Sequence, residues 1–212
     1  RAATAGENIE QGVVMFRASK RESESSEKRA VLRALIDGEG DGCSNAIIFC
    51  NRKTEVDILA KSLKTYGYNA EPIHGDLEQS QRTRTLDGFR DGKVRFLIAS
   101  DVAARGLDIP AVTHVFNYDV PSHAEDYVHR IGRTGRAQAV GDAFTLVTPE
   151  NASDVRDIER FLGQKIPELK LEGFEYKAFA PRPAEPAHFK PRGSLPGTIR
   201  HTGSFRRFKS RR

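Results

Sequence analysis

Residues 46–50 read Ala-Ile-Ile-Phe-Cys, five apolar residues in a row with no polar position between them. A strand with one face in water alternates polar and apolar side chains, whereas a strand covered on both faces is apolar throughout. Residues 94–99 (VRFLIA) form a second run that is nearly as apolar. The two runs therefore predict central strands of a parallel sheet that lies between two layers of helices.

Outward from these runs, strand-like and helix-like segments alternate along the chain. Helical segments have apolar side chains three and four positions apart, whereas the strand segments are short and rich in β-branched and aromatic residues. The predicted strands are residues 9–16, 46–50, 70–73, 94–99, 113–118 and 142–148, and the predicted helices are residues 26–37, 54–66, 79–90, 101–104, 122–131 and 151–162. This alternation predicts a three-layer α/β/α fold with a mainly parallel sheet. In such folds, ligands bind outside the carboxyl ends of the strands.

Positive charge is concentrated at the C-terminal end. The 212 residues include 34 Lys and Arg and 29 Asp and Glu, a net charge of +5. Residues 177–212 hold ten of the basic residues and one acid, so residues 1–176 carry 24 basic and 28 acidic residues, a net charge of −4. The same segment holds five of the ten prolines and four phenylalanines, without a periodic apolar pattern.

Such a segment cannot bury enough apolar surface to offset the entropy lost on ordering it. We therefore expect a globular domain at residues 9–170 and a disordered basic tail, rich in Pro, Arg and Phe, at residues 171–212. Arginine attracts phosphates and phenylalanine stacks on bases, so the tail is expected to bind a nucleic acid. The alternative is a passive, solubilising extension.

The cysteine count and the hydropathy exclude several protein classes. Two cysteines are too few for a disulfide-dense scaffold, and the six residues between Cys43 and Cys50 do not match the spacing of a zinc-binding pair. We expect reduced, partly buried thiols and no metal ligands in this chain. The sequence has no transmembrane run and no apolar signal core, so we expect a cytoplasmic protein with no membrane partner.

Residues 129–136, HRIGRTGR, hold the densest cluster of one charge sign. On a helical path, Arg130, Arg133 and Arg136 would lie within about a third of the circumference, and no acid stands among them. A phosphate group would supply the missing anion, and the two glycines would let the backbone approach it. The alternatives are a solvated basic face and the GxxG loop of a KH RNA-binding module.

The segment after the strand 94–99 also suits a nucleotide or a nucleic acid. Ser100 lies at the carboxyl end of this strand, where its hydroxyl and the following N–H groups could hold a phosphate. Asp108 offers a carboxylate to a ribose hydroxyl. The alternative is that Ser100 and Asp101 only cap a helix.

Two further strand ends offer groups for an anion. Gly75 follows the strand 70–73, and Arg82 lies in the first turns of the next helix. Asn51 and Arg52 follow the strand 46–50 in a third basic strand end. Helix capping is the alternative for the polar residues around Gly75.

Four segments in order, IIFCNRK, HGDLEQSQR, SDVAARGLD and HRIGRTGR, resemble motifs IV, IVa, V and VI of DEAD-box ATP-dependent RNA helicases. The resemblance covers about residues 9–165, and the lead-in YDVPSHAEDYVHR at 118–130 is also similar to the family. It implies a second RecA-like domain, followed here by a basic tail as in some bacterial members.

The resemblance also implies roles at an ATP site. Arg133 and Arg136 correspond to the arginine fingers that reach the ATP phosphates, Asp108 to the ribose contact, and His129 belongs to the same ATP-facing motif. Phe49 is expected to pack behind the motif VI arginines and position them. Contacts to the RNA backbone, independent of base sequence, map to Asn51, Arg52, Gly75, Arg82 and Ser100; the family often has Thr where Ser100 stands, and either hydroxyl can serve.

Other family motifs do not occur in the sequence, among them GxxxxGK(S/T), Asp-Glu-Ala-Asp and Ser-Ala-Thr. We therefore expect the phosphate loop and the Mg²⁺ ligands in a first RecA-like domain of the same protein, linked through residues 1–8. The present chain would be the C-terminal half of an ATP-dependent RNA helicase and would not hydrolyse ATP alone. The alternatives are a stand-alone RNA-binding or annealing module without an ATPase role and a DNA helicase of the same superfamily.

Overall fold

The computed structural model describes residues 8–136 and 139–171. The predicted linker at residues 1–8 and the predicted tail at residues 171–212 lie outside these ranges, apart from Asn8 and Leu171. The strands are β1 (Ile9–Met15), β2 (Ala46–Cys50), β3 (Ala70–Ile73), β4 (Phe96–Ser100), β5 (His114–Asn117) and β6 (Gly141–Val147); the α-helices are α1 (Glu24–Glu39), α2 (Lys53–Thr65), α3 (Gln79–Arg90), α4 (Asp101–Arg105), α5 (Ala124–Ile131) and α6 (Ala152–Leu162).

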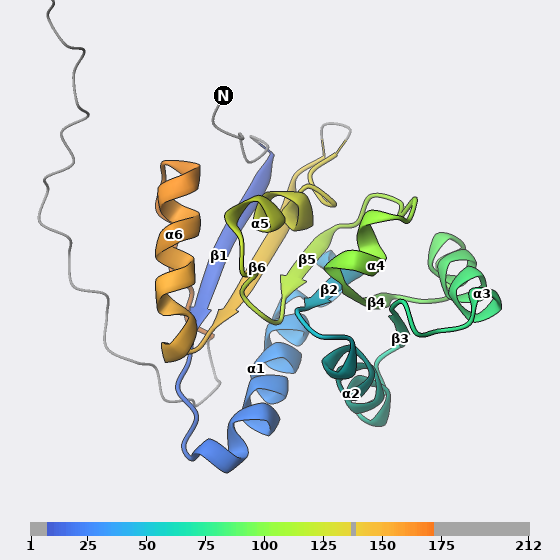
Figure 1. Cartoon of the computed structure of the whole chain (residues 1–212), viewed down its shortest axis with the longest axis horizontal. Helices are drawn as coiled ribbons and strands as arrows, with labels where there is room; N and C mark the ends of the chain where they lie inside the picture. Colours follow the sequence, from blue (N-terminus) through green and yellow to red (C-terminus); the bar gives the residue numbers. More distant parts are fainter. Residues whose placement is uncertain (1–7, 137–138, 172–212) are drawn as a thin grey trace, which may run out of the picture. The chain divides into compact units, whose positions relative to one another are not determined.

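The six strands form one sheet in the order β1-β6-β5-β2-β4-β3, and every neighbouring pair is parallel (Figure 1). β2 lies between β4 and β5. From β2 the chain crosses to β3 and returns to β4 before it passes to β5 on the other side. Ligands of open parallel sheets bind where the strand order reverses in this way, so the loops after β2, β4 and β5 surround the expected site.

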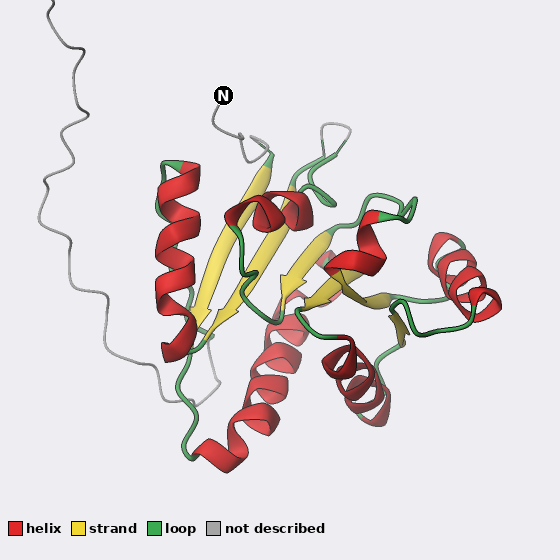
Figure 2. Cartoon of the chain, viewed as in Figure 1, coloured by secondary structure: helices red, strands yellow, loops and turns green. Residues whose placement is uncertain are grey.

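Alternate side chains of β2 enter two separate cores. Ala46, Ile48 and Cys50 pack with apolar side chains of α1 and α2, whereas Ile47 and Phe49 pack with those of α3, α5 and α6. None of the five is more than 2% exposed, and full burial of one large apolar side chain contributes roughly 1.5–3 kcal/mol. Figure 2 shows the helices on the two sides of the sheet. The predicted three-layer fold is therefore confirmed.

A short extended segment after α6 was not predicted. Val13 N–H donates to Pro167 O at 2.9 Å, and Leu169 N–H donates to Val13 O at 2.8 Å, with a parallel bridge between Val13 and Glu168. Gly12 makes this approach possible, because a Cβ there would lie 2.2 Å from Leu169 Cδ1. The segment covers the outer edge of β1 and is too short to give a periodic signal in the sequence.

Both thiols are free and fully buried, rather than partly buried as predicted. Burial raises the pKa of Cys43 to about 11 and also raises the pKa of Cys50. Because the thiolate is the reactive form, the folded chain is expected to resist a thiol reagent at pH 8 and to react at both cysteines after denaturation. The measurement is labelling with an aromatic disulfide, followed by its absorbance; fast labelling of the native chain would contradict the described burial.

The helices of the described ranges are all too short or too polar to cross a membrane.

Candidate functional site

The predicted RNA-binding residues lie along the carboxyl ends of three neighbouring strands. Asn51 and Arg52 follow β2, Ser100 ends β4, and Gly75 is the second residue after β3. Because β2, β4 and β3 are adjacent and parallel, and strands stand roughly 4.8 Å apart, these residues form one row along the sheet edge. The tertiary structure thus brings together segments that are widely separated in sequence.

A buried histidine shapes the turn after β3. His74 is 4% exposed, and its Nε2 lies 2.9 Å from Asp57 Oδ1 on α2. Its Nδ1 accepts a hydrogen bond from Asp76 N–H at 3.3 Å. The imidazole therefore connects α2 to the turn and leaves Gly75 between them exposed.

Arg82 keeps a hydrogen-bond donor for a ligand. Its Nη1 lies 3.4 Å from Gln79 Oε1, a weak contact within α3. Its buried Nε has no partner among the described residues. An unpaired buried donor is costly, and the role of Arg82 toward RNA stays a prediction.

Arg130 is buried beneath this edge, with 1% exposure. Its Nε and Nη2 donate to the two carboxylate oxygens of Asp101 at 2.7 and 2.6 Å, and its Nη1 donates to Asp119 O at 2.7 Å. Nη2 also donates to Asn51 Oδ1 at 2.7 Å. The guanidinium lies 5.2 Å from the centre of the Phe49 ring. Arg130 thus joins the loops after β2, β4 and β5.

This arrangement corrects the prediction that three arginines share one anion. The anion for Arg130 is Asp101, 29 residues earlier in the sequence. The helical path is also wrong beyond Ile131, where α5 ends. Arg133 and Arg136 lie in the turn after the helix and line a separate pocket. Of the three arginines, it is Arg130 whose guanidinium lies over the Phe49 ring.

Asn51 makes hydrogen bonds within the domain through its side-chain amide and its backbone N–H. Its Oδ1 accepts from Arg130, its Nδ2 donates to Val120 O at 2.8 Å, and its N–H donates to Asp119 Oδ2 at 2.9 Å. A neighbouring hollow of about 280 Å³ is lined by Asn51 and Arg52 together with Asp119 and Lys28. The hydrogen bonds of Asn51 therefore fix the loop that presents Arg52.

Three of the four predicted ATP-facing residues lie together. His129, Arg133 and Arg136 line an open pocket of about 380 Å³ whose other lining residues include Arg105 and Gly132. Asp108 is not among them: its carboxylate is fully exposed and lies 3.7 Å from Arg90 Nη2. The structure therefore assembles the arginines and leaves Asp108 outside their pocket.

The pocket is electropositive. Arg133 Nη2 donates to Ala104 O at 3.1 Å, and Arg136 Nε donates to Gly132 O at 2.8 Å. Within the described ranges neither guanidinium makes an ion pair with a carboxylate. Burial, and secondly the charge of Arg136, lowers the pKa of Arg133, although arginine stays protonated at neutral pH. The side chains that line this pocket offer donors to an anion, and among the described lining residues none is a carboxylate.

Gly135 is required by chain packing. Its φ is +66°, in the left-handed region. A Cβ would lie 2.6 Å from Ile9 Cγ1 and 2.9 Å from Asn8 O. The sequence predicted that Gly135 would let the backbone approach a phosphate. In the structure, the backbone at Gly135 instead approaches the start of β1.

Sequence reasoning missed two groups at this edge. Asp101 was considered only as a helix cap, because its partner Arg130 is distant in sequence. Arg105 at the end of α4 lines the arginine pocket and pairs with Asp126 on α5. The sequence did offer one indication of Arg105, because it lies at the end of the short helix that follows the predicted site residue Ser100. A hollow of about 670 Å³, lined by residues of α3 and β3, contains none of the predicted site residues among its described lining.

The chain matches the family model described as the helicase conserved C-terminal domain over residues 27–138, more than half of its 212 residues. It is 46% identical over 149 residues to the DEAD-box ATP-dependent RNA helicase CshA of Geobacillus kaustophilus. That alignment covers 70% of this chain and 32% of the relative. The chain thus spans about a third of the length of this curated relative.

Two solved structures are similar in fold and sequence. The Escherichia coli DEAD-box protein SrmB, determined with the regulator of ribonuclease activity A, matches with a TM-score of 0.74 and 30% identity, over 84% of this chain and 99% of that chain. Saccharomyces cerevisiae Dbp5 bound to RNA and ADP BeF3 matches with a TM-score of 0.69 and 31% identity, over 78% of this chain and 42% of that chain. The chain therefore belongs to the helicase C-terminal domain family, as the RecA-like C-terminal domain of a DEAD-box RNA helicase.

Proposed function

We propose that this domain is the C-terminal half of an ATP-dependent RNA helicase, with Arg133 and Arg136 as arginine fingers at an ATP site shared with a first RecA-like domain. The observation that carries the proposal is the pocket lined by Arg105, Arg133 and Arg136, where the last two donate to backbone carbonyls and meet no carboxylate within residues 8–136 and 139–171. A triphosphate held by the other domain would supply the anion. ATP and its Mg²⁺ would bind mainly to that domain, since no carboxylate is among the described residues that line the pocket here.

The RNA backbone would follow the row formed by Arg52, Ser100, Gly75 and Arg82. A similar protein, Dbp5, has been solved bound to RNA and ADP BeF3, and the present chain matches 42% of the Dbp5 chain, which supports a role of this domain in a protein that binds both. Contacts to phosphate and ribose are independent of base sequence. Two half-sites, one on each domain, would hold a strand across the cleft, and closure would separate a few base pairs.

Helix α4 links the proposed RNA-binding row of this domain to its arginine pocket. Ser100 precedes its first turn, and Ala104 O near its end accepts the hydrogen bond from Arg133. RNA contact at Ser100 would therefore position Arg133 through five residues. Asp108, just beyond α4, would reach the ribose from outside the arginine pocket.

The experiment compares the isolated chain with a two-domain protein made by adding the first RecA-like domain of a relative such as CshA. Phosphate release is measured with Mg-ATP, with and without unstructured RNA. The isolated chain is expected to be inactive, and the two-domain protein to show RNA-stimulated turnover on the order of 1 s⁻¹. Comparable turnover by the isolated chain would contradict the shared site.

The same experiment distinguishes the proposed helicase function from the alternative, a stand-alone RNA-binding or annealing module. That function is favoured by the net charge of +9 that ten basic residues and one acid give residues 177–212. A module of this kind would anneal RNA strands alone and gain no RNA-stimulated ATPase activity from the first domain.

A further inference from the structure

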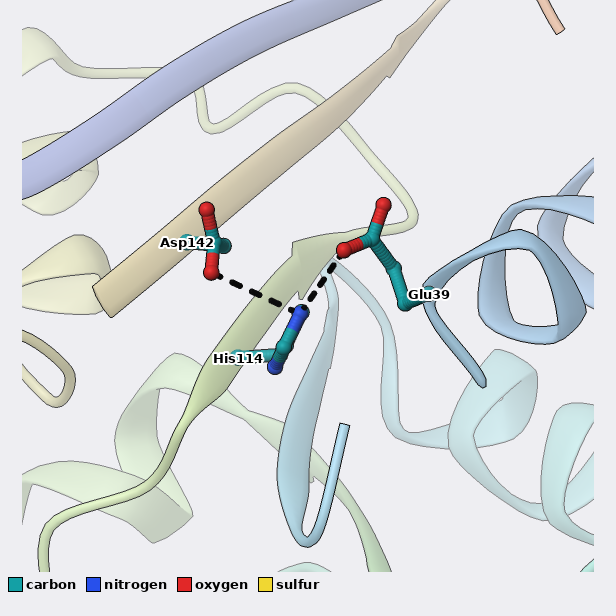
Figure 3. Close-up of side chains that lie close together, drawn as sticks. All are labelled: Glu39, His114 and Asp142. Atoms are coloured by element: carbon teal, nitrogen blue, oxygen red, sulfur yellow. Dashed lines mark hydrogen bonds and ion pairs between the residues drawn. The ribbon is translucent and has the colours of Figure 1, made fainter. Parts of the chain in front are cut away.

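Glu39, His114 and Asp142 converge on one another (Figure 3), at the edge of the sheet opposite the carboxyl ends of the strands. Glu39 ends α1, His114 begins β5, and Asp142 is the second residue of β6, so all three lie at the amino edge of the parallel strands. His114 Nε2 lies 3.1 Å from Glu39 Oε2 and 3.6 Å from Asp142 Oδ2. One ligand atom from each residue lies within 4.8 Å of the others.

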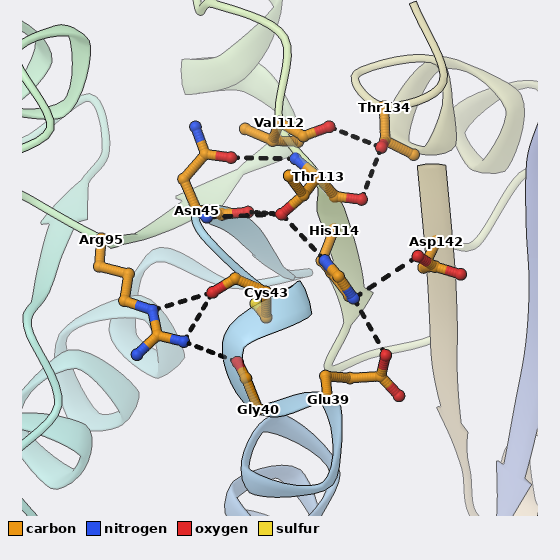
Figure 4. Close-up of polar contacts among 10 residues, drawn as sticks. All are labelled: Glu39, Gly40, Cys43, Asn45, Arg95, Val112, Thr113, His114, Thr134 and Asp142. Atoms are coloured by element: carbon orange, nitrogen blue, oxygen red, sulfur yellow. Dashed lines mark hydrogen bonds and ion pairs between the residues drawn. The ribbon is translucent and has the colours of Figure 1, made fainter. Parts of the chain in front are cut away.

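The imidazole of His114 is held in one orientation. It is buried, and its ring stacks on Phe116 with centres 5.9 Å apart. Its Nδ1 lies 2.9 Å from Thr113 Oγ1, and that hydroxyl donates to Asn45 O at 2.8 Å (Figure 4). Because the Thr113 hydroxyl gives its proton to Asn45 O, its oxygen can only accept from His114. The tautomer that fits this geometry therefore carries a proton on Nδ1, which donates to Thr113 Oγ1. Metal-binding histidines are commonly oriented through their second nitrogen in this way.

Nε2 of His114 then faces two carboxylate oxygens at 3.1 and 3.6 Å, an arrangement that a cation between the three groups would stabilise. A proton would satisfy the hydrogen bonds but leaves one of the two negative charges uncompensated. Neither Glu39 nor Asp142 pairs with Lys or Arg within the described residues. The guanidinium of Arg95 is directed to backbone oxygens, those of Gly40 and Cys43, at 2.6–3.2 Å.

We propose that Glu39, His114 and Asp142 form a structural site for a divalent transition-metal ion of the Zn²⁺ class. With metal–ligand bonds of about 2.0–2.2 Å, neighbouring ligands of a tetrahedral ion stand roughly 3.3–3.6 Å apart, close to the two distances above. One imidazole and two carboxylates suit Zn²⁺ or Co²⁺ better than Mg²⁺. The carboxylate side chains are 30% exposed, so a water molecule can complete the coordination.

The ion would connect three elements that are distant in sequence. It would join the end of α1 to the starts of β5 and β6 and neutralise both carboxylates. A site of this kind stabilises the folded chain by mass action, because the unfolded chain does not hold the three ligands together. The sequence could not show it, since its ligands lie 75 and 28 positions apart.

The test is titration of the metal-free 212-residue chain with Co²⁺ and Zn²⁺. We expect one tight site, a visible ligand-field absorption with Co²⁺ that Zn²⁺ abolishes, and a higher melting temperature with Zn²⁺. Glu39→Gln and Asp142→Asn keep the side-chain shapes and are expected to weaken binding at least ~100-fold, and Thr113→Val about 10-fold. His123→Gln, at an exposed histidine on the opposite edge, is the control and should bind normally.

Circular dichroism establishes that each variant is folded before it is titrated. Equal Zn²⁺ affinity in the native chain, Glu39→Gln and Asp142→Asn would place the ion elsewhere and overturn the proposal. Absence of tight binding in the native chain would overturn it as well, and would leave a proton as the cation shared by the three residues.

Discussion

Replacing Arg136 with alanine in a two-domain protein is expected to lower ATP turnover about 10³-fold or more, with little change in ATP affinity. The reason is that Arg136 is exposed, lines the open pocket and, among the residues that the structure describes, has Gly132 O as its hydrogen-bond partner. Its charge is free to act on the negative charge that develops in the transition state. The measurements are RNA-stimulated phosphate release at saturating ATP and equilibrium binding of a nucleotide.

Arg136→Lys keeps the charge but loses the planar fork, so it should recover only part of the activity. Arg160→Ala is the matched control, because Arg160 is an exposed arginine on α6 whose side chain is 75% accessible. It should leave turnover unchanged. If Arg136→Ala binds ATP more weakly but keeps normal turnover at saturating ATP, Arg136 is a ligand of bound ATP in the ground state. The assignment of Arg136 as an arginine finger would then be wrong.

Replacing Asp101 with alanine is expected to destabilise the isolated chain by about 3–5 kcal/mol, the typical cost of leaving a buried charge without its partner. Arg130 is 1% exposed and loses both short hydrogen bonds to this carboxylate. Its remaining contacts, to Asn51 Oδ1 and Asp119 O, supply no full negative charge. The measurement is urea unfolding, in which the midpoint should fall with little change in slope.

Asp157→Ala is the control for Asp101→Ala. It removes the partner of Arg160 in an ion pair whose side chains are 66% and 75% exposed, and such pairs contribute at most about 1 kcal/mol. Asp101→Asn keeps hydrogen-bond capacity without the charge, so its loss of unfolding free energy should lie between those of Asp101→Ala and Asp157→Ala. Equal losses in Asp101→Ala and Asp157→Ala would show that the Arg130 contacts do not stabilise the domain.

The strands were predictable because burial on both faces leaves a local signal. The run at 46–50 coincides with β2, and the predicted helix at 79–90 coincides with α3. At 166–169 no such signal exists, since the segment forms only two hydrogen bonds to Val13 along the edge of β1. A segment stabilised by its partner strand rather than by its own pattern cannot be read from periodicity.

The arginine motif shows where local reasoning failed. The spacing of Arg130, Arg133 and Arg136 was correctly noted, but a shared helical face was wrong, because α5 ends at Ile131 and the following glycine turn redirects the chain. The partner of Arg130 was missed because Asp101 comes from another strand end. The motif thus predicted a charged site without predicting which arginine remains available to a ligand.

The sequence by itself determined the layers, the parallel strands and the motifs that mark the helicase family, since each of these depends on residue types at short spacing. Only the tertiary structure decided which charges meet. It buried Arg130 against Asp101, directed Arg133 and Arg136 to backbone carbonyls, and brought His114 between two acids at the opposite edge. Such contacts depend on the register and order of strands, and a parallel sheet places at one edge residues that the chain separates by dozens of positions.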